Sequence, residues 1–323
     1  MAAPTTPFSV YQDSRFRQEA REAFDAEILS SSSSTKDKSD QLISIQSFSF
    51  QFIKDASRRP QAEAEAVQEG LYVLWHMFIE TAKALEKDDP FQEKLVSLLL
   101  WTKELDSIHR SLHPTENATA GWESYGFADS LQTHWEQLLI TGTGKQQCNL
   151  AAFSAKLFAV NSCQDSLRLT VLWYLRAALE VEDETKTIAL LPAAVVWVDH
   201  CRHKLLTLSV IEQSDKEPRS QLLAAGELAR KAGVDQDGFS LQRWLFWRRR
   251  FQELSHNEDK EVVKEAKKGF MNMIFCGREL DFDVPGEAKF TERLQAAMWE
   301  ALVNSGKESV SGDEIDIDVD WVD

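Results

Sequence analysis

The segment AEAEAVQEGLYVLWHMFIETAKAL, residues 62–85, carries the pattern from which the fold class follows. Its apolar side chains recur every three or four residues, which is the spacing of one face of an α-helix. That face collects Val67, Leu71, Leu74, Trp75, Phe78 and Ala82. Pro60 stands just before the segment, where a proline suits the start of a helix. We therefore expect a long amphipathic helix here.

The same helical pattern recurs along most of the chain, between short connections. One repeat follows Pro90 and is stopped by His113-Pro114, and the others cover residues 129–140, 150–160, 165–182, 187–211, 219–232, 240–254, 260–275 and 285–303. Only 13 glycines and 8 prolines interrupt 323 residues. The tryptophans inside these segments are irregularly spaced, which argues against a regular repeat array. We predict an all-α protein with a single helical domain over residues 1–305, built as an irregular multi-helix array or short solenoid of about ten to twelve helices.

Two segments fall outside the helical pattern. Residues 30–40, SSSSSTKDKSD, are polar and of low complexity, and we expect them to form a mobile loop. The C-terminal run GDEIDIDVDWVD, residues 312–323, alternates apolar and acidic side chains, which is a strand period. An all-α body has no sheet to pair with such a strand. We therefore predict a disordered acidic tail over residues 306–323, which either adds to the sheet edge of a partner or only improves solubility.

The overall charge and the cysteines limit the class of protein. The chain has 36 basic and 52 acidic residues and a formal net charge of −16, which argues against a general nucleic-acid binder. No run approaches the roughly 20 apolar residues of a membrane span, and the N-terminus lacks a secretory pattern. Four widely spaced cysteines are typical of reduced thiols. We expect a cytoplasmic or nuclear protein that is not secreted and has no membrane partner.

The motifs that suggest chemistry are weak. Residues 139–146, LITGTGKQ, resemble a phosphate-binding loop, but Leu139 and Gln146 stand where that loop needs Gly and Ser or Thr. His200, Cys201 and His203 form a cluster without the further ligands that a zinc site requires. No nucleophile signature appears. We therefore expect no catalytic, cofactor-binding or metal-binding residues, and favour a protein that is not an enzyme.

The segment SLQRWLFWRRRFQEL, residues 240–254, combines aromatic and basic side chains. Helical spacing places Trp244, Trp247, Phe251 and Leu254 on one core-facing stripe. The arginines beside that stripe, together with the apolar side chains of the tail, are our candidates for docking a partner protein: Arg243, Arg248, Arg249, Arg250, Ile315, Ile317, Val319 and Trp321. Because the tail is acidic, we also hypothesise that it folds back on the arginines and can be displaced.

Four blocks in this order resemble a fungal family known as domain of unknown function 3632. They are an aromatic element over residues 122–135, the pair CNLAAFSAKL and LWYLRAALE within residues 148–180, LPAAVVWVDH over residues 191–200, and GFSLQRWLFWRRRFQEL over residues 238–254. The resemblance extends over about residues 40–300. It implies a fungal, intracellular, mostly helical protein, and it transfers no functional residue. The acidic tail lies outside the family pattern.

Two functions are compatible with these observations. The leading hypothesis is a non-enzymatic protein-interaction or scaffold module that uses its helical surface and acidic tail to bind an unidentified protein. The alternative is a helical protein with an aromatic-lined pocket that binds or converts an apolar small molecule, for which ten tryptophans and 18 phenylalanines supply the material. Convergence of Arg176, Asp199, His200 and Arg243 on one cavity would favour the pocket.

Overall fold

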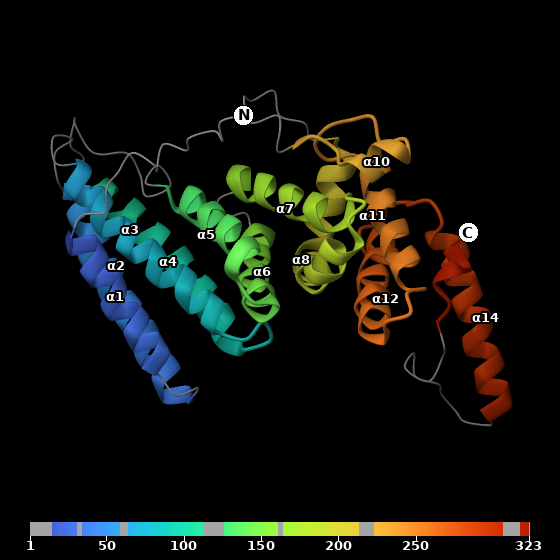
Figure 1. Cartoon of the computed structure of the whole chain (residues 1–323), viewed down its shortest axis with the longest axis horizontal. Coiled ribbons are helices and arrows are strands. Elements are labelled where there is room, and N and C mark those ends of the chain that lie inside the picture. Colours follow the sequence, from blue (N-terminus) through green and yellow to red (C-terminus); the bar gives the residue numbers. More distant parts are fainter. Residues whose placement is uncertain are drawn as a thin grey trace. The chain divides into compact units, whose positions relative to one another are not determined.

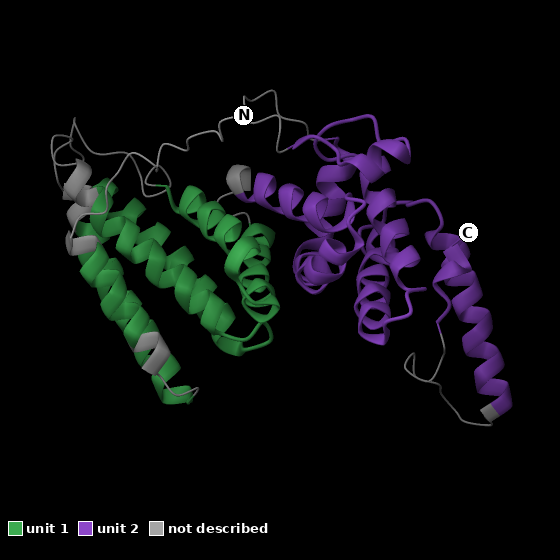
Figure 2. Ribbon diagram, viewed as in Figure 1, with its two compact units in different colours: residues 1–166 green, residues 167–323 purple. Residues whose placement is uncertain are grey.

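The computed structural model describes residues 15–30, 34–58, 64–112, 126–160, 164–212, 223–305 and 317–322. These residues form α-helices with short connections and one 3-10 turn, and no strand occurs among them (Figure 1). The all-α prediction is confirmed. The internal contacts of the chain divide it into two compact units, residues 1–166 and 167–323 (Figure 2). The single helical domain over residues 1–305 stays a prediction. None of the described helices is both long enough and apolar enough to cross a membrane.

Unit 1 is arranged around α3. Its helices are α1 (Arg15–Ser30), α2 (Thr35–Arg58), α3 (Ala64–Ala84), α4 (Pro90–Leu112), α5 (Phe127–Thr141) and α6 (Gly144–Ala159). Helix α3 packs against each of the other helices of the unit, from α1 and α2 to α4, α5 and α6. The helix predicted after Pro90 is confirmed as α4, which ends at Leu112 before His113-Pro114.

The central position of α3 explains why it is apolar on more than one face. The predicted stripe is buried at Leu71, Leu74, Trp75 and Phe78, and so are Val73, Met77 and Ile79, which lie off that stripe. A helix that is apolar around most of its circumference is stable only when neighbours cover all of those faces. Burial of the additional side chains therefore makes α3 the core helix of unit 1.

The Ser-rich segment is more helical than its composition predicts. Helix α2 begins at Thr35, so residues 35–40 belong to a helix and not to the mobile loop that we expected. Ser34 precedes the helix, and its Oγ accepts a hydrogen bond from the backbone N–H of Asp37 at 3.2 Å. A serine in this position satisfies a donor that the first turn leaves unpaired. Residues 31–33 lie outside the described part of the chain.

The segment that resembles a phosphate loop is a helix cap. Thr143 Oγ1 accepts a hydrogen bond from Gln146 N, and the Gln146 side chain accepts one from Thr143 N at 3.2 Å. Together these bonds form a capping box at the start of α6. Lys145 forms an ion pair with Glu86 at 2.7 Å. Gln146, the residue that breaks the phosphate-loop pattern, is therefore the residue that the cap requires.

Unit 2 is built on the packing of α8, α11 and α12. Its elements are α7 (Gln164–Leu179, whose first residues belong to unit 1), α8 (Glu184–Val210), α10 (Glu227–Lys231), α11 (Leu241–Leu254), α12 (Lys260–Ile274), α13 (Cys276–Glu279), α14 (Glu287–Ser305) and the 3-10 turn η5 (Val319–Val322). The core stripe predicted for α11 is confirmed, because Trp244, Trp247, Phe251 and Leu254 are buried. The helix expected over residues 219–232 is observed only as the short α10, and residues 213–222 lie outside the described residues.

The capping box predicts a measurable contribution to stability. We expect Thr143→Ala to lower the free energy of unfolding by about 1 kcal/mol, because it leaves the backbone N–H of Gln146 without its acceptor. Urea unfolding monitored by circular dichroism measures this change. Thr141→Ala is the matched control, since the exposed Thr141 hydroxyl only donates to the Gln137 carbonyl within α5. Equal stability of the two variants would contradict the role of the cap.

Candidate functional site

Arg243, the first candidate docking arginine, lies in the core of unit 2 opposite Glu180. Both residues are completely buried. Arg243 Nε donates to Glu180 Oε1 at 2.7 Å, and Arg243 Nη2 donates to Glu180 Oε2 at 3.1 Å. This is the two-point geometry in which a guanidinium binds a carboxylate most strongly. The pair joins the end of α7 to the first turn of α11.

The remaining hydrogen-bonding capacity of Arg243 is also used within unit 2. Its Nη1 donates to the carbonyls of Leu223 and Gly238, both at 2.8 Å, and its Nη2 donates to the carbonyl of Ala224 at 3.3 Å. With the two bonds to Glu180, all five N–H donors of the guanidinium have an acceptor. Arg243 therefore holds the two ends of the segment 223–238 together and has no N–H donor left for a partner protein.

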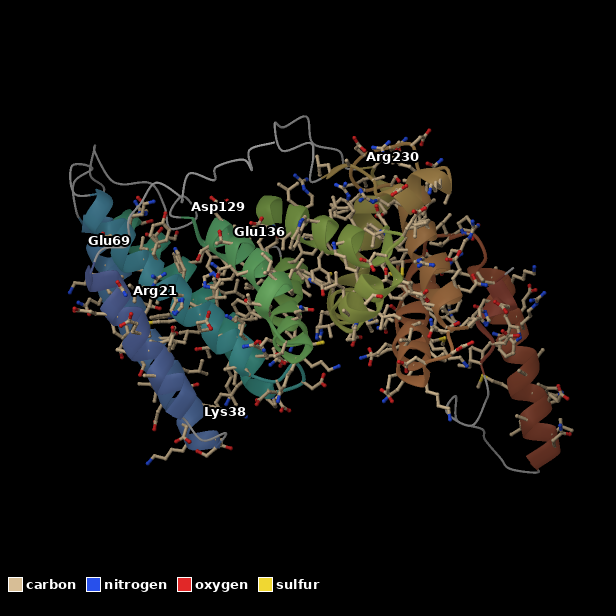
Figure 3. The ribbon with its side chains drawn as sticks, viewed as in Figure 1. Arg21, Lys38, Glu69, Asp129, Glu136 and Arg230 are labelled. Atoms are coloured by element: carbon tan, nitrogen blue, oxygen red, sulfur yellow. The ribbon has the colours of Figure 1, made fainter. Side chains whose placement is uncertain are left out.

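Glu180 is saturated in the same way. Its Oε1 also accepts a hydrogen bond from Trp247 Nε1 at 2.7 Å, and its Oε2 accepts one from Gly226 N. A Cβ at position 226 would stand 2.5 Å from Glu180 Cβ, so only glycine fits. The neighbouring Arg230, labelled in Figure 3, pairs with Asp237 at 2.8 Å and holds the same loop at the surface. The cluster is a structural centre whose polar groups are all occupied.

The three following arginines of α11 have different environments. Arg248 is buried, and its Nη2 donates to the Pro285 carbonyl at 2.6 Å. Arg249 is exposed, whereas Arg250 is half-buried and pairs with Glu253 at 2.8 Å. The surface depression that contains Arg250 is also lined by Glu182, Glu184 and Glu253. Acidic side chains therefore outnumber the arginine there, and this part of α11 is not a basic patch.

The C-terminal end of the tail is folded and forms the turn η5. Val319 and Val322 are buried, and the ring of Trp321 lies 5.9 Å from the ring of Phe290 on α14. Residues 317–322 are therefore neither disordered nor extended as a strand, which corrects our expectation for this end of the tail. Ile317 is half-buried at its start. Ile315 and the rest of residues 306–316 lie outside the described residues, so the predicted disorder there stays a prediction.

The acidic group of η5 is held by polar side chains of α11 and its C-terminal end. Asp320 Oδ1 accepts a hydrogen bond from Gln252 Nε2 at 2.9 Å and lies 3.2 Å from His256 Nε2. The hydrogen bond from Gln252 holds the pKa of the Asp320 carboxyl below its usual value. Arg293 Nη1 from α14 donates to the Asp320 carbonyl at 3.3 Å.

The loop before α14 completes the contact surface for the turn. Gly286 adopts φ +89°, which is available to glycine without strain, and a Cβ there would stand 2.5 Å from Val322 Cγ2. The hydrogen bond from Arg248 on α11 to the Pro285 carbonyl holds this loop in place. We call the set that receives η5 the tail-docking surface: Gln252, His256, Gly286, Phe290 and Arg293. The end of the tail thus packs chiefly on α14, and Gln252 of α11 binds its Asp320. Displaceable docking of the tail on the arginine cluster stays a hypothesis.

The cluster of His200, Cys201 and His203 is not among the groups of potential metal ligands that the described residues form. The thiol of Cys201 donates a hydrogen bond to the Trp197 carbonyl. Burial raises the pKa of this thiol. His203 Nε2 instead pairs with Glu279 at 2.6 Å. A cluster that the sequence did not predict lies in unit 1, where His76, Glu80 and His134 each place a ligand atom within 4.8 Å of the others. Its only sequence signal is the four-residue spacing of His76 and Glu80 on α3.

The buried ion pair predicts a large loss of stability when one charge is removed. We expect Glu180→Gln to lower the free energy of unfolding by about 3–5 kcal/mol, because it leaves the Arg243 charge buried without a counter-ion. Chemical denaturation followed by circular dichroism tests this expectation. Glu253→Gln on the exposed face of α11 is the matched control and should change stability little. A loss as small as that of the control would contradict a central role for the pair.

The comparisons with known proteins concern the same residues. The model of the family described as "Protein of unknown function (DUF3632)" matches residues 75–251, more than half of the chain, and includes both Glu180 and Arg243. The oxopyrrolidines biosynthesis cluster protein G of Penicillium oxalicum (strain 114-2 / CGMCC 5302) is 24% identical over 223 residues. That alignment covers 60% of this chain and 61% of the relative, less than two thirds of its length. No solved structure matches the chain. The chain thus belongs to the DUF3632 family.

Proposed function

We propose that the protein is a non-enzymatic protein-interaction module, and that the tail-docking surface is where it binds. The partner in this proposal is a protein that carries a short acidic segment with a terminal aromatic and aliphatic residue, similar to Asp318-Val319-Asp320-Trp321-Val322. The protein's own tail then acts as a competitor for the same surface. The observation that carries the proposal is the docking of this short C-terminal segment through both buried apolar side chains and an anchored carboxylate.

Two chemical features make the tail-docking surface suitable for such a segment. Phe290 provides an aromatic face for Trp321, and aromatic anchors supply much of the binding energy at small interfaces. Gln252 and Arg293 supply hydrogen-bond donors that match a carboxylate and a backbone carbonyl. The eleven residues 306–316 connect the tail to α14, so docking within the chain raises the local concentration of the competitor.

The comparisons are consistent with a role that involves no chemistry of its own. The name of the Penicillium relative assigns that protein to a biosynthesis cluster and states no reaction. An accessory role beside biosynthetic enzymes would therefore fit this chain as well. As part of the same proposal, we place the protein in the cytoplasm or nucleus, because Cys201 and Cys276 form no disulfide.

A pocket for an apolar small molecule has less support from the described residues. The largest aromatic side chains fill the cores of the units: Trp75, Trp135, Trp197, Trp244 and Trp247 are fully buried. A groove between α2 and α4 is lined by aliphatic and polar side chains, including Leu42, Ile43 and Leu98, and by no aromatic one. Convergence of Asp199 and Arg243 on one cavity would have favoured the pocket. Arg243 instead pairs with Glu180, and Asp199 pairs with Lys268.

A competition experiment tests the proposal. We expect a labelled peptide of residues 315–323 to bind the chain truncated after Ser311 and to bind the full chain at least tenfold more weakly, because the attached tail occupies the surface. Fluorescence anisotropy measures both affinities. A peptide with Trp321→Ala should lose at least tenfold in affinity, since it lacks the aromatic anchor.

A pair of matched variants locates the binding site. Gln252→Ala in the truncated chain should weaken peptide binding several-fold, whereas Gln242→Ala on the exposed side of the same helix should not. Absence of peptide binding, or equal binding to the full and truncated chains, would contradict the proposal. Loss of helicity on truncation would also contradict it, because the tail would then be an obligatory part of the core.

A further inference from the structure

Three potential ligands from two helices meet in unit 1. His76 and Glu80 lie one turn apart on α3, and His134 comes from α5, the helix on which Figure 3 labels Asp129 and Glu136. His134 Nε2 lies 3.7 Å from Glu80 Oε1, and the two imidazole rings have centroids 5.8 Å apart. One ligand atom of each residue lies within 4.8 Å of the other two. A single ion placed among them would bridge α3 and α5.

The hydrogen bonds on the far side of each ring determine which nitrogen carries the lone pair. His134 Nδ1 lies 2.7 Å from the Ser130 carbonyl, which can only accept, so Nδ1 carries the proton and Nε2 carries the lone pair. His76 Nε2 lies 2.7 Å from Asp25 Oδ1 on α1, so the proton is on Nε2 in the same way. Carbonyl and carboxylate partners of this kind orient the histidine ligands of metal sites.

The other nitrogen of His76 has no alternative use. His76 is 9% exposed, and its Nδ1 is buried without a hydrogen-bond partner in the structure. Leaving a buried acceptor unpaired costs free energy, and a metal ion would remove that cost.

Charge around the cluster is compatible with a cation. Glu80 and Asp25 contribute two carboxylates, and Lys83 contributes one ammonium group, which donates to Glu80 Oε1 at 2.7 Å. The same Oε1 lies 3.7 Å from His134 Nε2, so a bound ion takes the second oxygen, Oε2, or displaces the Lys83 ammonium group from Oε1. The net charge of these groups is therefore negative when both histidines are neutral.

We propose that His76 Nδ1, His134 Nε2 and the Glu80 carboxylate bind a divalent transition metal of the zinc type. Two imidazoles with one carboxylate suit Zn²⁺, whereas Mg²⁺ and Ca²⁺ prefer sets of oxygen ligands. Asp25 and Ser130 are the positioning groups that orient the two rings. The site lies in unit 1 and does not depend on the tail-docking surface, so its failure and the failure of the proposed function are separate results.

Metal titration of the full chain tests the site. After treatment with a chelator, we expect the protein to bind one equivalent of Zn²⁺ by isothermal titration calorimetry and to raise its melting temperature on binding. Co²⁺ in place of Zn²⁺ should give the visible absorption of a site with imidazole ligands. His134→Gln and His76→Gln should abolish the tight equivalent, and Asp25→Asn should weaken it by about 10–100-fold, as expected for a partner that orients a ligand.

The controls separate this site from incidental binding. His203→Gln removes an exposed histidine that pairs with Glu279 and should leave the Zn²⁺ affinity unchanged. Circular dichroism shows whether each variant is folded, and Asp25→Asn keeps all three ligands if a histidine variant does not fold. Absence of Zn²⁺ binding by the full chain would overturn the proposal. Binding of unchanged affinity in His134→Gln and Asp25→Asn would do so as well.

Discussion

Glu180 and Arg243 face each other with neither side chain exposed to solvent, and much of unit 2 depends on that contact. Two opposite charges can be buried only if their attraction and their hydrogen bonds offset the loss of hydration. Here the carboxylate and the guanidinium are both fully hydrogen-bonded, by each other, by Trp247 and by the backbone of the loop before α11. The ion pair therefore constrains the end of α7, the loop and the start of α11 at once.

This ion pair also joins two of the four blocks in which the chain resembles the family. LWYLRAALE ends at Glu180, and GFSLQRWLFWRRRFQEL contains Arg243 and Trp247. The two blocks are far apart in sequence, and in the structure they meet at one buried cluster. Their charged and aromatic residues thus maintain the fold, and this pattern by itself assigns no activity to the family.

Helical periodicity predicted the fold class, most helices and the buried stripe of α11, because that information is local. It could not pair Glu180 with Arg243, because residues 180–184 have the composition of an exposed acidic helix end. Glu182, Asp183 and Glu184 are indeed exposed, whereas Glu180 is buried. The tail was misjudged for a related reason. Alternation suggested a strand, whereas the 3-10 turn buries Val319 and Val322, three residues apart, on the same side. The cluster of His76, Glu80 and His134 depends on the packing of α3 on α5, which sequence spacing does not contain.

The close approach of Gly226 to Glu180 links positions that are distant in the chain. Any side chain at position 226 would push against Glu180 Cβ and its carbonyl, which a Cβ there would approach at 2.5 and 2.7 Å. That displacement would strain the contact with Arg243 as well. Positions 180, 226 and 243 are therefore not independent, and the effects of substitutions at them should not add. Gly226 thereby limits which substitutions at positions 180 and 243 are compatible with this fold.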